Sequence, residues 1–312
     1  MNRFIAPLIV SGLGFVILVL GIMQILPGLT SAGGFLVFLG LFLLGLSFIP
    51  KPESEDNIVP PMSAVERLTK IFYAPAEVFQ NLRRHPRWAA ALLVMWLVSG
   101  VYFFAFVQRI TPDVIASHLT NKTIQTTEQM GVTMPPDRVA QMRRDNLTQY
   151  KEPLARLGMA ISNSIASFIG FAILAAIFLI AILAFGGSIN YWQALAATVY
   201  AYFPIAIIRS LLSLIILFVK DPSDIHPILG QQSLVTDNLG VLFKAAESPV
   251  LYSLASAIGL LSLYWLWLMA TGLKNAGERV SGSTAWTVAL IVWIFSVVIG
   301  VATAAMFPSF LS

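Results

Sequence analysis

Apolar runs of about 20 residues constrain this chain more than any other feature, because a helix of that length rises roughly 30 Å, the hydrocarbon thickness of a bilayer. The sequence is 57% hydrophobic and 11% charged, whereas soluble globular chains are roughly 45–50% apolar and about 25% charged. We therefore predict an all-α, polytopic integral membrane protein with a bundle of about seven transmembrane helices. The predicted spans are residues 4–26, 33–49, 88–107, 157–185, 195–219, 250–273 and 286–307.

The spans and the polar stretches between them divide the chain into three parts. Residues 1–50 are predicted to form a transmembrane hairpin. Its first run is longer than the roughly 7–15 apolar residues of a signal peptide, so we interpret it as a retained span. Residues 51–61, KPESEDNIVPP, are acidic and rich in proline, which is typical of a solvated linker. Residues 62–312 hold the remaining five spans and form the main membrane domain.

An amphipathic segment, residues 63–84, precedes the third span. Ser63 and Glu66 have the spacing of a capping box, which predicts that a helix begins at Ser63, and Pro75 should break or kink it. Basic residues end this stretch and predict a patch beside anionic lipid head groups. A solvated basic linker is the alternative interpretation. The candidate patch comprises Arg67, Lys70, Arg83, Arg84 and Arg87.

Several classes of function are excluded by what the residues do not form. The net charge of +4 comes from basic residues scattered over several loops, which does not fit nucleic-acid binding. The chain has no cysteine, and His85, His118 and His226 are far apart in the sequence. The stretch from Asp221 to His226, with Asp237, could hold a hard cation, but such clusters are more typical of turns. We predict no catalytic residue, cofactor or metal site.

Arg209 is the ionisable residue that falls inside a predicted span, and such residues are the default functional candidates in membrane proteins. It precedes Lys220, at the end of the span, by 11 residues, which puts it roughly 16 Å deep, near the middle of the bilayer. No Asp or Glu lies in any predicted span to pair with it. Tyr202 and Ser213 share its helix face, and Pro204 frees the carbonyl of Tyr200.

Polar residues on two other predicted spans complete a candidate intramembrane site. Asn163 and Ser167 lie on one face of the preceding span, and Ser256 lies roughly 10 Å deep in the sixth. Two interpretations are open. The residues could line a polar cleft around Arg209, or they could make ordinary interhelical hydrogen bonds while Arg209 snorkels to the surface.

Three stretches between about Leu68 and Phe307 resemble the Yip-one (Ypt-interacting protein) domain family, in particular its bacterial branch. They are KIFYAPAEVFQNLRRHPRW before the third span, WQALAATVYAYFPIAIIRSLL in the fifth, and SAIGLLSLYWLWLMATGLKNAGERVSG before the last. The resemblance implies a five-helix bundle preceded by a cytoplasmic region, and no enzyme activity. The chain departs from the family in its extra N-terminal hairpin.

Orientation and partners depend on this resemblance. Lys and Arg number about nine on each side of the predicted topology, so charge alone does not orient the chain. The resemblance implies a cytoplasmic N-terminus, which an odd number of spans places opposite Ser312. Eukaryotic relatives bind small GTPases, but their acidic D-L-x-G-P signature is absent here, so we do not expect GTPase binding. A prokaryotic cytoplasmic membrane is the expected location.

Two functional hypotheses follow. The first is a non-catalytic scaffold or adaptor that organises membrane proteins or lipids, which rests on the family resemblance. The second is a carrier or scramblase-like passage for an anionic lipid or small anion, centred on Arg209. Membrane lipids are the expected partners of either, and other membrane proteins are the expected partners of the first.

Overall fold

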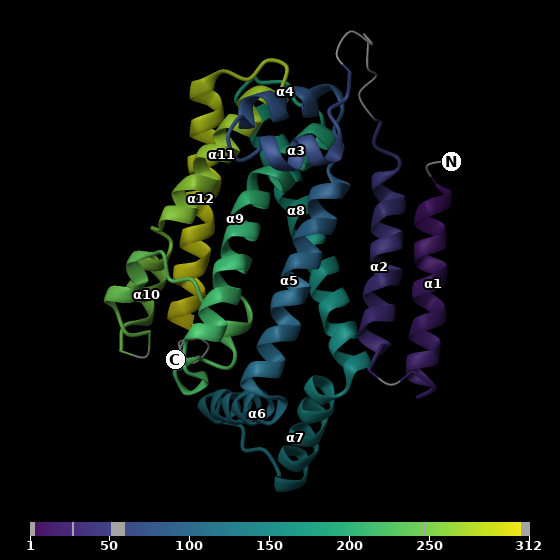
Figure 1. Ribbon diagram of the computed structural model, residues 1–312, viewed down its shortest axis with the longest axis vertical. Helices are drawn as coiled ribbons and strands as arrows, with labels where there is room; N and C mark the ends of the chain where they lie inside the picture. Colours follow the sequence, from purple (N-terminus) through teal and green to yellow (C-terminus); the bar gives the residue numbers. More distant parts are fainter. Residues whose placement is uncertain (1–3, 27, 51–59, 246, 307–312) are drawn as a thin grey trace. The chain divides into compact units, whose positions relative to one another are not determined.

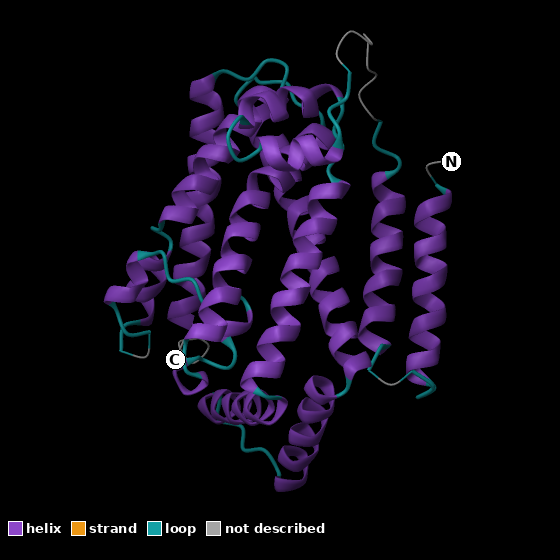
Figure 2. Cartoon of the chain, viewed as in Figure 1, coloured by secondary structure: helices purple, strands orange, loops and turns teal. Residues whose placement is uncertain are grey.

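The computed structural model describes residues 4–26, 28–50, 60–245 and 247–306. In these ranges every named element is helical, which confirms the predicted all-α class (Figures 1 and 2). The elements before the long central helices are α1 (Ile5–Ile22), α2 (Thr30–Leu46), α3 (Ala64–Lys70) and α4 (Pro75–Arg84). They are followed by α5 (Ala89–Ile110), α6 (Pro112–Gln129), α7 (Pro136–Lys151), α8 (Pro153–Ala184), α9 (Tyr191–Val219), three short 3-10 turns, α10 (Pro249–Ser256), α11 (Leu260–Ala276) and α12 (Gly282–Met306).

Five of the described helices, α1, α5, α8, α9 and α12, are long and apolar enough to cross a bilayer, and α2 is a shorter apolar helix of 17 residues. A helical membrane bundle is therefore confirmed. The predicted sixth span is wrong as a single helix, because residues 250–273 are divided between α10 and α11. The linker predicted at residues 51–61 lies mostly outside the described residues.

The chain divides into two compact units, which are described separately. Unit 1 comprises residues 1–50, 99–169 and 210–234, and unit 2 comprises residues 51–98, 170–209 and 235–312. Helices α5, α8 and α9 each contribute residues to both units. In unit 1 a buried cluster joins α5, α6, α7, the end of α9 and the chain after it through Tyr102, Phe106, Val107, Ile110, Ile115, Tyr150, Leu217 and Ile225.

Helices α1 and α2 of unit 1 pack closely through glycines. A Cβ atom added to Gly33 would lie 2.6 Å from the Cα atom of Leu18, and one added to Gly14 would lie 2.5 Å from the amide nitrogen of Val37. Small residues allow the two backbones to approach in this way, which is how membrane helices gain packing energy without a hydrophobic driving force. The neighbouring Gly34 faces away, with nothing within 4 Å of its Cβ position.

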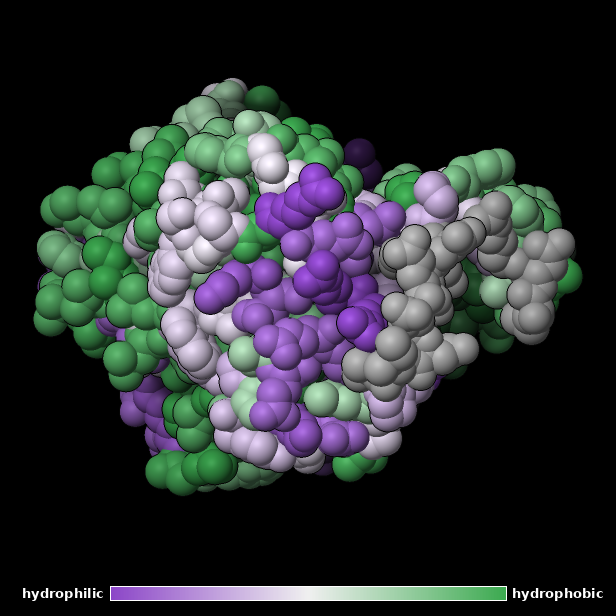
Figure 3. Space-filling model, turned by 90° about the horizontal axis from the view of Figure 1, so that it is seen from above, coloured by the Kyte–Doolittle hydropathy of each residue, from purple (hydrophilic) through white to green (hydrophobic). Residues whose placement is uncertain are grey.

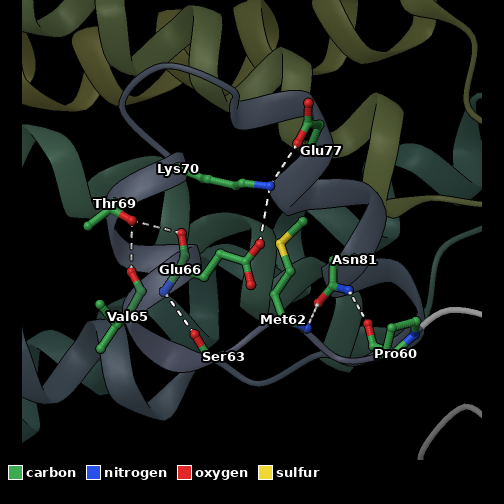
Figure 4. A network of polar contacts seen from close by, with 9 residues as sticks. All are labelled: Pro60, Met62, Ser63, Val65, Glu66, Thr69, Lys70, Glu77 and Asn81. Carbon is green, nitrogen blue, oxygen red and sulfur yellow. Dashed lines mark hydrogen bonds and ion pairs between the residues drawn. The ribbon is translucent and has the colours of Figure 1, made fainter.

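Helices α3 and α4 form the part of unit 2 that we call the cap (Figure 1). The hydroxyl of Ser63 accepts a hydrogen bond from the Glu66 amide at 3.1 Å, as the capping-box spacing predicted, and Pro75 begins α4. Lys70 bridges the carboxylates of Glu66 and Glu77, at 3.1 and 3.2 Å, and the hydrogen bonds to them raise its pKa (Figure 4). The cap is therefore an ordered element and not a solvated linker.

The apolar face of α4 packs on α11. Phe79 and Leu82 are fully buried, and the Phe79 ring lies 3.1 Å from the Cβ position of Gly272. Asn81 accepts a hydrogen bond from the Met62 amide and donates one to the Pro60 carbonyl, which fixes the chain before α3 (Figure 4). At the end of α4 the Gln193 side chain, from the start of α9, donates to the Arg83 carbonyl at 2.8 Å.

The hairpin provides a matched pair of substitutions. Gly33→Ala should destabilise it by about 1–3 kcal/mol, since the new methyl group overlaps the backbone of Leu18. Gly34→Ala should be neutral or slightly stabilising, because its Cβ has open space and Ala is the better helix former. Limited proteolysis of the hairpin at increasing temperature, with both variants in detergent, measures this stability. An equal loss of stability in the two variants would contradict the packing.

Candidate functional site

A break between two helices, inside the run predicted as the sixth span, is the main irregular feature of unit 2. Helix α10 ends at Ser256 and α11 begins at Leu260, while Gly259 between them is extended, with φ −147° and ψ 163°. A Cβ atom on Gly259 would lie 2.9 Å from the Cβ atom of Asn238, so the close approach of the 237–240 segment favours glycine there. No local sequence pattern marked this break, because Ala257, Ile258 and Gly259 are all compatible with an apolar helix.

The segment 237–240 supplies hydrogen bonds that the break removes from the helix. The amide of Leu239 donates to the Ile258 carbonyl at 3.0 Å, and the amide of Leu260 donates to the Asp237 carbonyl at 3.2 Å. One carboxylate oxygen of Asp237 accepts from the Leu261 amide at 2.7 Å. Asp237 therefore caps the N-terminus of α11 from a distant part of the chain, where the helix dipole also favours a negative charge.

The other carboxylate oxygen of Asp237 lies 3.8 Å from Nη2 of Arg209. The side chains are 11% and 31% exposed, respectively, so the pair is largely removed from solvent. We expected no acidic partner for Arg209, because no Asp or Glu occurs in a predicted span. That expectation is wrong because Asp237 comes from the polar stretch after α9 and returns to the helix break. The Nε atom of Arg209 is buried without a hydrogen-bond partner among the described residues.

The other predicted site residues are divided between the units. Tyr202 and Ser256 belong to unit 2 with Arg209. Tyr202 is half-buried, with its ring 5.3 Å from that of Phe171, and Ser256 has a buried hydroxyl without a hydrogen-bond partner in the described chain. The residues in unit 1 are Ser213, Asn163 and Ser167.

In unit 1 these three side chains have other surroundings. Ser213 is buried and interacts with the chain after α9, through the Leu234 amide at 2.9 Å and the Ser233 hydroxyl at 3.1 Å. Asn163 and Ser167 are exposed on α8, and Ser167 donates to the Ser164 carbonyl at 2.7 Å. The predicted contact of Asn163 and Ser167 with Arg209 therefore stays a prediction. The partner of Arg209 in the structure is the carboxylate of Asp237.

One residue of the predicted basic patch, Arg67, does not lie on the surface. Arg67 is only 3% exposed and points into unit 2, although we expected it on the membrane surface. Lys70 is held between two carboxylates, Arg83 is half-buried, and Arg84 and Arg87 are exposed. The apolar face of α4 is covered by α11, so it is not free to lie in lipid as an interfacial helix would.

The stretch from Asp221 to His226 forms turns, which was the favoured interpretation. The carboxylate of Asp221 accepts hydrogen bonds from the amide and hydroxyl of Ser223, at 2.9 and 2.7 Å, and these bonds lower its pKa. Among the described residues no group of three or more His, Cys, Asp or Glu side chains could hold a metal ion.

Comparison with known protein families shows that the profile of the Yip1 domain matches residues 69–305. The chain belongs to the Yip1 domain family. The match covers most of the chain, including α4, the Arg209–Asp237 pair and the broken helix, while the hairpin α1–α2 lies outside it. Neither the curated proteins nor the solved structures contain a significant match.

In this Yip1 domain the site is a broken helix whose second half is capped by a carboxylate of the chain itself. At such breaks in transporters, the N-terminus of the second half-helix faces an anionic group of the substrate. Here the carboxylate of Asp237 lies at the N-terminus of α11 and beside Arg209. An internal anion therefore occupies the position that an anionic ligand would take.

Substitutions at Asp237 and Arg209 should separate the two roles of the Asp237 carboxylate, which are to pair with Arg209 and to cap α11. Asp237→Ala should lower stability by about 1–3 kcal/mol, because it removes the counter-charge of the partly exposed Arg209 and the acceptor at the α11 terminus. Asp237→Asn should lose less, since the amide oxygen can still accept from Leu261. Adding Arg209→Leu to Asp237→Asn should restore stability, because no charge then lacks a partner. Thermal unfolding in detergent measures the order of stability of these variants. A double variant that is less stable than Asp237→Asn would show that Arg209 is not held by Asp237.

Proposed function

We propose that this protein is a non-catalytic multi-pass membrane protein of the Yip type that acts as a scaffold or adaptor, organising lipids or other membrane proteins at the outward face of its cap. Membership of the family supports a membrane protein, and the family is not one of enzymes. The observation that carries the proposal is the orientation of α3. This helix turns the apolar Val65 outward, 71% exposed, and the charged Arg67 inward, 3% exposed.

The outward face of the cap combines features of a contact surface. Tyr73 is 71% exposed, close in sequence to the Lys70 bridge and to Phe72, which is 40% exposed. Figure 3 shows hydrophilic side chains gathered on the side of the molecule that carries the cap, bordered by hydrophobic ones. Exposed aromatic and apolar side chains with a polar rim are typical of protein or membrane contacts.

Within this proposal the N-terminus and the cap face the cytoplasm, and the membrane is a prokaryotic cytoplasmic membrane. The clustered Arg83, Arg84 and Arg87 directly before α5 support this orientation through the positive-inside tendency, as does the resemblance to the bacterial branch of the family. Reporter fusions after Lys51 and after Ser312 that are active on the same side would contradict it.

The exposed Arg84, at the end of the cap, and Arg87, just after it, should concentrate anionic lipid. Each basic residue near an anionic surface contributes roughly 1 kcal/mol, and salt screens the attraction. A dye on Val65→Cys, in a chain without natural cysteines, reports the enrichment of labelled anionic lipid by energy transfer. Arg84→Glu with Arg87→Glu should abolish the salt-sensitive part of this enrichment. Arg143→Glu with Arg144→Glu, exposed on α7, is the matched control and should change it little; equal losses in the two pairs would contradict a role of the cap.

A passage for an anionic lipid or small anion is the second candidate. The observation in its favour is the pair of buried polar atoms without a partner among the described residues, Nε of Arg209 and Oγ of Ser256, in the unit that contains the broken helix. The guanidinium could bind a phosphate there if the Asp237 carboxylate were displaced.

Flip rates of fluorescent lipids in proteoliposomes distinguish the two candidates. The scaffold proposal expects the rate of protein-free vesicles for both anionic and zwitterionic lipids, unchanged by Arg209→Leu. A passage centred on Arg209 would accelerate the anionic lipid, and Arg209→Gln combined with Asp237→Asn, which leaves neither charge unpaired, would remove the acceleration while leaving the yield of folded protein nearly intact. Acceleration of that kind would replace the scaffold proposal with the carrier.

A further inference from the structure

His226 holds a turn of unit 1 through its side chain. Its Nδ1 atom accepts hydrogen bonds from the backbone amides of Ile228 and Leu229, at 3.2 and 3.1 Å, and its carbonyl accepts from the Gly230 amide at 3.0 Å. A ring nitrogen that accepts N–H bonds has its lone pair engaged and carries no proton. The neutral His226 ring therefore carries its proton on Nε2.

Residues 225–231, which we call the clasp, connect this turn to two helices of unit 1. The hydroxyl of Tyr102, on α5, donates to the Gly230 carbonyl. The hydroxyl of Tyr150, on α7, donates to the Gln231 side chain at 3.2 Å, and that side chain donates to the Pro227 carbonyl at 2.9 Å. Ile225 is 4% exposed and belongs to the buried cluster of the unit. The position of the clasp thus depends on the turn that His226 stabilises.

We propose that His226 is a pH-sensitive switch for the clasp, in which a proton from solvent binds to Nδ1, displaces the Ile228 and Leu229 amides, and releases residues 225–231 from α5 and α7. The step adds one proton and breaks two hydrogen bonds at the same atom. Nδ1 cannot accept the two amides and bear a proton at once, so protonation and the closed turn exclude each other. This inference goes beyond the proposed function and does not depend on it.

The surroundings of His226 favour its neutral form. On α6 the ring of His118 lies 4.8 Å from the His226 ring, edge to face, and its Nε2 atom is buried without a hydrogen-bond partner among the described residues; Lys122 follows one turn later. From α5 and α7 the clasp meets the phenols of Tyr102 and Tyr150. On the same loop Asp221 and Asp224 are exposed, and Arg109 of α5 interacts with Asp221.

These groups set the direction of the pH dependence. Burial, then the charges of His118 and Lys122, lowers the pKa of His226, and burial followed by Lys122 lowers the pKa of His118. Because the open form binds the proton more readily than the closed form, the closed clasp has its full stability above the ordinary histidine pKa of about 6.5 and loses it as the pH falls further.

The same geometry argues against a two-histidine metal site. A metal would need the Nε2 lone pair of His226, but that atom carries the proton while Nδ1 accepts the amides. No third ligand of the usual kinds completes the pair within the described part of the chain. The proton is the ligand that fits.

Hydrogen exchange of the full-length protein in detergent or nanodiscs tests the proposal, with rates corrected for the intrinsic effect of pH. Peptides covering residues 222–234 should be protected at about pH 7.5 and lose protection below about pH 6, by up to about tenfold per pH unit, the limit for a single proton. Peptides from α12 serve as the internal reference. Constant protection of residues 228–230 down to about pH 4.5 would overturn the proposal, since even a depressed histidine should then be titrating.

Three variants separate the switch from simple acid unfolding. In His226→Asn the side-chain oxygen can still accept from the following amides but does not titrate, so the turn should stay protected at both pH values. His226→Ala should be unprotected at both. Lys122→Gln removes a repulsive charge, so the loss of protection should begin at a higher pH than in the wild type. The same acid-dependent loss in His226→Asn as in the wild type would overturn the proposal.

Discussion

The constraint on which the rest of unit 2 depends is that backbone polar groups away from water need hydrogen-bond partners within the protein. A helix that breaks inside the apolar part of a chain is tolerated only where other groups of the protein replace its missing hydrogen bonds. Here the segment 237–240 does so with two backbone bonds and one carboxylate. Asp237 must reach the break for this reason, and Arg209 then finds a partner at the same place.

Helices long enough to cross a bilayer were predictable from the sequence, because the length and hydropathy of an apolar run identify them. The runs that become α1, α5, α8, α9 and α12, and the helix start at Ser63, all follow from local pattern. The break at Gly259 was not predicted, because Gly is common in membrane helices and its cause is the approach of Asn238 from a separate segment. Asp237 was assigned to a polar loop for the same reason, since sequence alone does not show that a loop returns to a span.

The candidate site illustrates the same limit residue by residue. Arg209 was singled out as the ionisable residue inside a predicted span, but its acidic partner lies outside every apolar run. Ser213 was grouped with Arg209 by helical spacing, but its hydroxyl instead accepts a hydrogen bond from the Leu234 amide. His118 and His226 are separated by more than a hundred residues and meet only through the packing of α6 against the chain after α9. Spacing rules describe one helix face and do not reach contacts between segments.

The inverted orientation of α3 has an energetic consequence for the cap. A rotation about the helix axis that exchanged Val65 and Arg67 would bury a side chain worth about 1.5–3 kcal/mol and return a guanidinium to solvent. Inside unit 2 the guanidinium of Arg67 interacts with the buried Tyr200 side chain, while Nε and Nη1 of Arg67 are buried without a hydrogen-bond partner among the described residues, so this internal contact offsets only part of the cost of burying Arg67. A contact on the outward side would add a further gain. There Val65 and Tyr73 would lose their exposed apolar area on contact with lipid or a partner protein, which is the contact that a scaffold requires.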